Sequence, residues 1–183
     1  MIGPGEWYQA FRREVRNPRR ADPLREVAIQ GRLGAWTEHL MGAVVLTCRN
    51  LGWSAVARGF PAEGFPVPKQ EYLAVDVMAF PQTDRPRWTK PVAAFELENR
   101  PDLEAISYAT WKVSVIRCAL AGVLCYCREP EEIGGLLAVL AQGVMADLHP
   151  WPGDQEPEIL LVVGARSRAE DFPDGFFKAH FWD

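Results

Sequence analysis

Three acidic residues lie in apolar segments whose composition is typical of buried strands. Asp76 falls within residues 71–80. Glu96 and Glu98 fall within residues 91–99. If the two segments pair, the three carboxylates approach one another closely. Ionised carboxylates in such a cluster repel one another and lose hydration, which is costly unless a cation lies between them. Oxygen ligands of this kind favour a hard divalent ion, Mg²⁺ or Mn²⁺.

The elements that must position these acids are two strands joined by a surface connection. Both segments are short and rich in residues that suit a pleated, half-buried surface. Side chains alternate across a strand, so Glu96 and Glu98 should point to one face and Leu97 to the other. The intervening residues, 81–90, are rich in proline and charge, which is typical of a loop. The sequence therefore predicts a hairpin that carries the acids on one face.

This order of an acid-bearing strand, a short connection and Glu-Leu-Glu resembles the PD-(D/E)xK nuclease superfamily, which has the restriction-endonuclease-like fold. Asp76 matches the aspartate of the first strand, and Glu96 matches the (D/E) position. Glu98 occupies the position that is usually lysine. The resemblance covers about residues 34–124 and depends more on the order of the elements than on the short motif.

The missing lysine matters because in this superfamily it helps to position or activate the attacking water. Some members carry Glu at that position, and others supply the lysine from the following helix. Lys112, in the segment after the hairpin, is the candidate for such a migrated lysine. The helix before the hairpin often supplies a further acid to the metal site, and Glu38 matches that position. The alternative for both residues is an ordinary solvated side chain.

The resemblance implies a metal-dependent nuclease that hydrolyses phosphodiester bonds of nucleic acid, with DNA the favoured substrate. Asp76 and Glu96 would hold Mg²⁺ or Mn²⁺ together with the Leu97 carbonyl, and Glu38 would serve a second ion. Either Glu98 or Lys112 would orient the attacking water.

Two other interpretations stay open. In the first, the chain is a catalytically inactive module of the same fold that binds nucleic acid or a partner protein. In the second, the chain is a structural protein in which the acids form buried ion pairs with Arg100, Arg58 or Lys90.

The remaining segments predict an α/β fold. Apolar residues at helical spacing predict helices over residues 6–15, 31–50, 103–120 and 131–148. Short apolar runs predict further strands over residues 53–60, 122–127 and 158–164, with a proline-rich loop over 61–68. A strand-helix-strand unit at the end favours a parallel pair. Together with the resemblance, which implies a restriction-endonuclease-like three-layer fold, these segments lead us to expect a mixed central β-sheet flanked by helices.

A chain of 183 residues, 48% of them hydrophobic, is long enough for one sizeable core. We expect a single domain over residues 1–183, with a basic N-terminal arm over 1–30 and an aromatic C-terminal flap over 166–183. The arm is basic because five arginines cluster there: Arg12, Arg13, Arg16, Arg19 and Arg20. Such a cluster is either a solvated surface or a phosphate-contacting patch.

The composition also argues against several classes of protein. No run approaches the roughly 20 apolar residues of a membrane span, and no signal peptide is recognisable, so we expect a cytoplasmic protein without a membrane partner. The four cysteines lie in apolar surroundings and are expected to be reduced core residues. Neither a phosphate-binding glycine loop nor a serine nucleophile elbow is present. The expected partner is nucleic acid, with DNA favoured, and a homodimer is left open.

Overall fold

The structure is a computed structural model that describes residues 2–61, 66, 71–148 and 157–182. Its helices in chain order are α1 (Pro4–Arg16), α2 (Pro18–Ile29), α3 (Leu33–Asn50), α4 (Leu103–Ser114) and α5 (Ile133–Gly143). Its strands are β1 (Trp53–Ala57), β2 (Val77–Pro81), β3 (Ala93–Leu97), β4 (Leu120–Cys127), β5 (Glu158–Ala165) and β6 (Phe177–Trp182). Short 3₁₀ helices are η1 (Pro130–Glu132), η2 (Met145–Asp147) and η3 (Arg166–Asp171). No helix of the described ranges is long and apolar enough to cross a bilayer.

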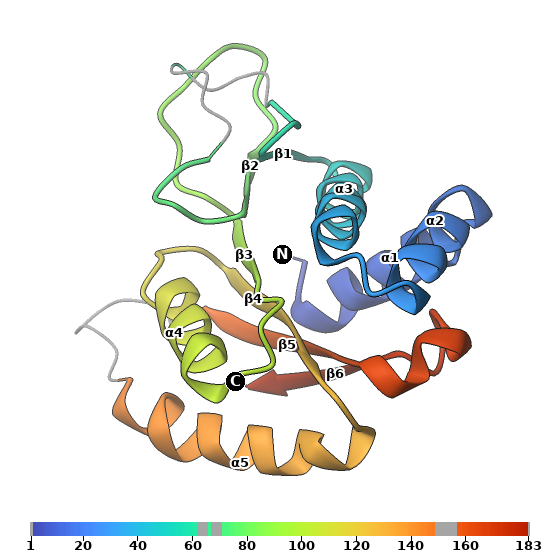
Figure 1. The fold of residues 1–183 in the computed structure, drawn as a ribbon. Coiled ribbons are helices and arrows are strands. Elements are labelled where there is room, and N and C mark those ends of the chain that lie inside the picture. The colour runs from blue at the N-terminus through green and yellow to red at the C-terminus, as the bar shows by residue number, and fades with distance from the viewer. Residues whose placement is uncertain (1, 62–65, 67–70, 149–156, 183) are drawn as a thin grey trace.

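The strands form one six-stranded sheet in the order β1-β2-β3-β4-β5-β6 (Figure 1). β1, β2 and β3 pair antiparallel, and β6 is antiparallel to β5. β3, β4 and β5 are parallel to one another, since α4 and α5 provide the crossover connections. The predicted α/β class, mixed sheet, β2–β3 hairpin and final parallel pair are confirmed.

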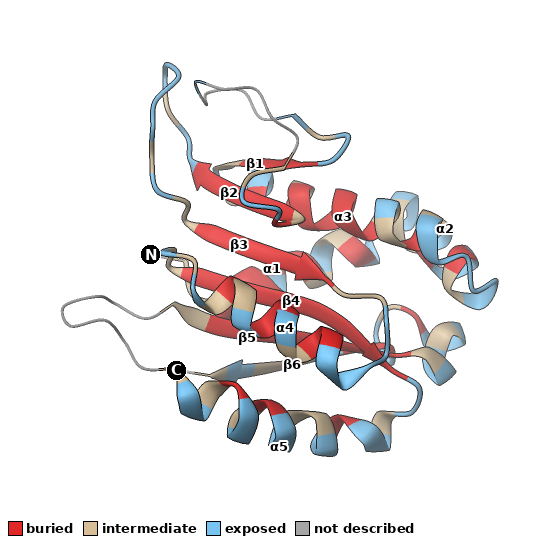
Figure 2. Ribbon diagram, turned by 60° about the vertical axis from the view of Figure 1, so that its left-hand side comes forward, coloured by how far each residue is buried: buried red, intermediate tan, exposed pale blue. Residues whose placement is uncertain are grey.

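Helices cover both faces of the sheet, so the domain has three layers (Figures 1 and 2). On one face, α1–α3 and the sheet share a core in which Leu40 and Phe95 are fully buried. On the other face, α4 and α5 share a core with the sheet in which Val113 and Val123 are fully buried. All eight residues of β4 are buried, which explains its continuous apolar sequence.

Residues 4–29 are not an extended arm but two helices that belong to the core. Trp7 is fully buried, stacks on Phe95 with ring centroids 4.4 Å apart, and donates to Cys48 Sγ. Pro18 begins α2, where its missing N–H removes no helical bond, and Asn17 caps that helix by accepting from the Arg19 N–H.

The C-terminal residues are more than a flap, because they complete the sheet and one of its cores. β6 pairs with β5 along its length. Phe172, Phe176 and Phe177 are buried around Trp36 of α3. These three aromatic residues are therefore part of the core.

Several predicted boundaries were too generous. The strand expected over 71–80 begins only at Val77, and the helix expected over 103–120 ends at Ser114. The N–H groups of Ala119 and Leu120 both donate to Val92 O, so the chain has already joined the sheet by that point. The helix expected over 131–148 is divided among η1, α5 and η2, and most of the 61–68 loop lies outside the described residues.

The burial of Trp7 predicts that the N-terminal helices are required for stability. Trp7→Ala should lower the free energy of unfolding by about 3–5 kcal/mol, because a large buried side chain leaves a cavity. Trp88→Ala is the control: the Trp88 side chain is 73% exposed, so the change should stay near 0.5 kcal/mol or less. Urea denaturation followed by far-UV circular dichroism measures both. A Trp7→Ala protein as stable as the control would show that α1 is dispensable.

Candidate active site

The register of β2 and β3 brings two of the predicted acids together. Val77 pairs with Phe95, so the antiparallel register continues to Asp76 opposite Glu96. Asp76 lies immediately before β2, and Glu96 is the penultimate residue of β3. Alternation directs both side chains to the face covered by α4.

Crossed hydrogen bonds fix the two carboxylates. The Asp76 N–H donates to Glu96 Oε1 over 3.2 Å. The Leu97 N–H donates to Asp76 Oδ2 over 2.8 Å. Each carboxylate is thus held by the backbone of the opposite strand, which restricts the rotamers of both side chains without any contribution from a loop.

Lys112, near the end of α4, is the cation of this site. Its Nζ lies 2.9 Å from Glu96 Oε1 and donates to Ala74 O over 2.6 Å. The side chain retains 19% of its accessible surface. Lys112 therefore lies beside the acidic hairpin, as expected. A catalytic role for Lys112 stays a prediction. α4 begins at the predicted cap, because Asp102 Oδ1 accepts from the Ala105 N–H.

A strained turn presents the carbonyl that Lys112 binds. Leu73 and Ala74 have φ values of 55° and 54°, and the Val75 N–H donates to Tyr72 O. Two consecutive left-handed residues are typical of a type I′ turn, which normally contains Asn and Gly. With Leu and Ala, the strain is about 1–2 kcal/mol per residue. Strain of this kind is often found at functional sites. This turn is not predictable from the sequence, because neither Leu73 nor Ala74 is a usual turn former.

Burial and the neighbouring charge shift the titration of both acids. Burial, followed by the charge of Asp76, raises the pKa of Glu96 from 4.5 to about 7. The Lys112 ammonium acts in the opposite direction but does not outweigh the loss of hydration. Burial also raises the pKa of Asp76, against the Leu97 N–H and Lys112, which lower it. At neutral pH the site therefore has a carboxyl group that gains or loses a proton readily.

The donor set suits a hard cation bound by two carboxylates. Asp76 Oδ1 and Glu96 Oε2 accept no hydrogen bond from the described residues, and neither is sealed from solvent. Mg²⁺ is commonly bound through one or two carboxylates, with water and substrate phosphate completing its shell. The described ranges contain no group of three or more His, Cys, Asp and Glu side chains that could hold a metal ion. The predicted convergence of three acids is therefore wrong for these residues, and the fit is to a two-carboxylate site.

Glu98 is engaged by its own turn. It follows β3, accepts from the Arg100 N–H over 2.8 Å, and has its Oε2 3.3 Å from Arg100 Nη2. Glu98 thus forms an ion pair with Arg100, but the Arg100 side chain is 71% exposed, so this is not the buried ion pair that the structural interpretation expected. Arg58 instead pairs with Glu71, and Lys90 is exposed.

Glu38 is exposed on the first half of α3. Its neighbour Thr37 accepts from Asn99 Nδ2 over 2.5 Å, so this part of α3 touches the turn after β3. Glu38 itself has no hydrogen bond or ion pair with Asp76 or Glu96 among the described residues. The structure supports a solvated side chain at this position.

Comparisons with known proteins gave no match among protein-family models, curated proteins or solved structures. The chemistry of the site is therefore inferred from its geometry: one lysine and two carboxylates converge where β2 begins and β3 ends.

The raised pKa of Glu96 predicts a specific pH dependence of stability. A carboxyl group with a folded pKa above its unfolded value stabilises the fold below pH 4.5, and this contribution is lost as the pH rises through about 7. Between pH 4.5 and 7.5, the free energy of unfolding of the parent should fall by about 3 kcal/mol relative to Glu96→Gln. Urea denaturation in chelator across this range measures the difference.

Asp84→Asn provides the control for this titration, because Asp84 is exposed in the loop between β2 and β3 and acts on neither Asp76 nor Glu96. Its stability should follow that of the parent throughout the range. A constant difference between the parent and Glu96→Gln would mean that Glu96 does not titrate with a raised pKa.

Proposed function

We propose that the protein is a metal-dependent phosphodiesterase that hydrolyses nucleic acid, with DNA the favoured substrate, on a restriction-endonuclease-like fold. The observation that carries this proposal is the convergence of Asp76, Glu96 and Lys112. Two carboxylates with open oxygens and a held ammonium are what hydrolysis of a phosphodiester requires: acids for a divalent ion and a cation for the developing charge.

The arrangement of the elements supports the same proposal. The aspartate stands at the start of β2, and Glu96 stands opposite it near the end of β3. The helix that follows, α4, returns over the sheet and brings Lys112 to Glu96. This is the order that the resemblance implies for a variant whose lysine has moved to the helix. The six-stranded mixed sheet between two helical layers agrees with the three-layer fold.

The residues of the chain have separable roles in this proposal. Asp76 and Glu96 would hold Mg²⁺ or Mn²⁺, and the ion would lower the pKa of a bound water and polarise the phosphoryl oxygen. A nearby cation would also favour the ionised form of Glu96, whose pKa is about 7 without it. Lys112 has three N–H donors, of which two are used by Ala74 O and Glu96. The third remains for a phosphoryl oxygen or the attacking water.

Between the two candidates for the role of the usual lysine, the geometry favours Lys112. Glu98 is bound by Arg100 through backbone and side chain. Lys112 contacts the acid at the centre of the site. A positive group is also better suited than a second carboxylate to stabilise charge on phosphorus oxygens.

An inactive module of the same fold is the second candidate function. The ammonium of Lys112 already has two acceptors within the protein, and that pairing partly offsets the buried charge of Glu96 without any metal. A protein of this kind would bind nucleic acid or a partner protein and would cleave nothing.

Binding of a divalent ion distinguishes these candidates first. Mn²⁺ should raise the melting temperature of the parent. At a free Mn²⁺ concentration about 100-fold above Kd, the free energy of unfolding should rise by about 2.7 kcal/mol. Asp76→Asn should abolish that gain while it keeps an oxygen for the Leu97 N–H. Asp84→Asn, in the exposed loop between β2 and β3, should retain it. If Mn²⁺ leaves the parent unchanged, the metal site is refuted.

Cleavage assays test the role of Lys112. Lys112→Met keeps most of the apolar stem, so the protein should fold while turnover on DNA with Mg²⁺ or Mn²⁺ falls by about 10²–10³-fold. The exposed Lys90 provides the matched control, and Lys90→Met should cleave like the parent. Glu98→Gln should cost less than about tenfold, because Glu98 is held by Arg100.

Two results would overturn this assignment. If Lys112→Met cleaves like the parent, the lysine is not part of the reaction. If the folded parent binds Mn²⁺ but cleaves neither single- nor double-stranded DNA or RNA, the inactive module is the better description.

A further inference from the structure

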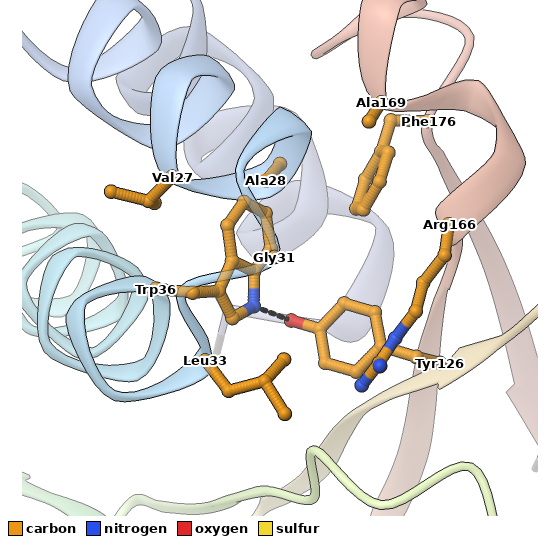
Figure 3. A pocket seen from close by; sticks show the side chains of 9 residues that line it. All are labelled: Val27, Ala28, Gly31, Leu33, Trp36, Tyr126, Arg166, Ala169 and Phe176. Carbon is orange, nitrogen blue, oxygen red and sulfur yellow. Dashed lines mark hydrogen bonds between the residues drawn. The ribbon is translucent and has the colours of Figure 1, made fainter.

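A second site lies on the opposite face of the sheet from the candidate active site. It is a cavity of about 120 Å³ between α2, α3, η3 and the ends of β4 and β5 (Figure 3). Its walls are mostly apolar and aromatic: Val27, Leu33, Trp36, Tyr126 and Phe176, with Arg166 as the one charged residue in the lining.

The cavity lies at the carboxyl ends of two parallel strands. Tyr126 is the penultimate residue of β4, and Arg166 directly follows β5. β4 and β5 are parallel, so both residues stand at the carboxyl ends of adjacent parallel strands.

Among the described residues, no acid neutralises the charge of Arg166. Its Nη2 donates to the backbone O of Asn99, and its guanidinium lies 5.5 Å from the centre of the Tyr126 ring. It forms no ion pair with the described residues. A guanidinium has five N–H donors, so several remain for an acceptor. A half-buried arginine without an anionic partner is costly, and an anion in the adjoining cavity would relieve that cost.

Two further groups in the cavity wall favour a negative charge. Tyr126 accepts from Trp36 Nε1 over 2.6 Å, which leaves its own O–H without an acceptor among the described residues. Burial raises the pKa of Tyr126, so the hydroxyl stays protonated and able to donate. The first turn of α3 also borders the cavity, and no side chain caps it. The positive end of a helix dipole adds to the attraction for an anion.

We propose that this cavity binds a small monocarboxylate whose body is apolar and about the size of one aromatic ring. One unpaired guanidinium balances one negative charge, and its planar donors match the two oxygens of a carboxylate. The apolar and aromatic walls suit the body of the ligand. The volume limits the body to one ring: the cavity of about 120 Å³ is smaller than the enclosed cavity of about 150 Å³ that accommodates benzene, but it is open on one side.

Benzoate is the test ligand, and benzamide is its neutral counterpart of the same shape. Titration of the parent by isothermal calorimetry or NMR should show saturable binding of benzoate and binding at least tenfold weaker for benzamide. Inorganic phosphate should not compete at equal concentration, since it lacks the apolar body. Equal binding of benzoate and benzamide, or no binding of benzoate, would overturn the proposal.

Substitutions in and near the cavity test whether benzoate binds there. Arg166→Gln should weaken benzoate at least tenfold, whereas Arg168→Gln should leave it within twofold. Arg168 lies in the same short helix and pairs with the exposed Asp171, which makes it a matched control. Because Arg166 also holds Asn99 O, Ala169→Leu supplies an independent variant that fills the cavity and leaves the arginine in place. Undiminished binding by Ala169→Leu would place the ligand elsewhere. All readouts are binding, so the result does not depend on the phosphodiesterase proposed above.

Discussion

The burial of one carboxylate, Glu96, is the constraint on which the organisation of the site depends. Glu96 lies in β3, where both neighbours along the strand are core residues, and its side chain retains only 12% of its accessible surface. A charge in that position is unfavourable unless hydrogen bonds and a cation offset the loss of hydration. The protein supplies one backbone N–H from Asp76 and one ammonium from Lys112. Even so, the pKa of Glu96 remains raised, so the protein alone does not fully compensate the charge.

That residual cost links the structure to the proposed chemistry. A purely structural ion pair would be expected to hold its carboxylate ionised well below neutral pH. Here two adjacent acids both have raised pKa values and each keeps one oxygen open. A divalent cation would relieve the repulsion between them. The strained turn that presents Ala74 O holds Lys112 beside Glu96 at a further energetic cost, which is characteristic of sites retained for function.

The three-layer fold also explains why two separate sites occur at one edge of the sheet. Alternation along the strands sends Glu96 to the face covered by α4 and Tyr126 to the face covered by α1–α3. The turn after β3 lies between them: Glu98 and Arg100 pair within it, and Asn99 O binds Arg166 of the cavity. The sheet thus separates an acidic, polar site from an aromatic pocket whose arginine, Arg166, has no ion pair among the described residues.

The sequence by itself determined the class of fold and the identity of the central acids. Alternating and continuous apolar runs fixed the order of strands and helices, because such patterns are local consequences of burial. The acids stood out because charge is rare in such runs. Only the tertiary structure decided which acids meet. The register of β2 and β3 places Asp76 opposite Glu96. Glu98 is instead held by hydrogen bonds within its own turn, and Glu38 is exposed and is not part of the site.

Long-range contacts also decided the features that no local pattern encodes. The lysine partner of Glu96 depends on the angle at which α4 crosses the sheet, and the left-handed turn at Leu73 and Ala74 runs against local preference. The N-terminal segment resembled a basic arm in sequence, yet Trp7 is buried against Phe95, which lies far along the chain in β3. Arg166 and Trp36 line one cavity only because α2 packs against both α3 and η3. Sequence spacing cannot indicate such pairs, since packing between distant elements is what brings them together.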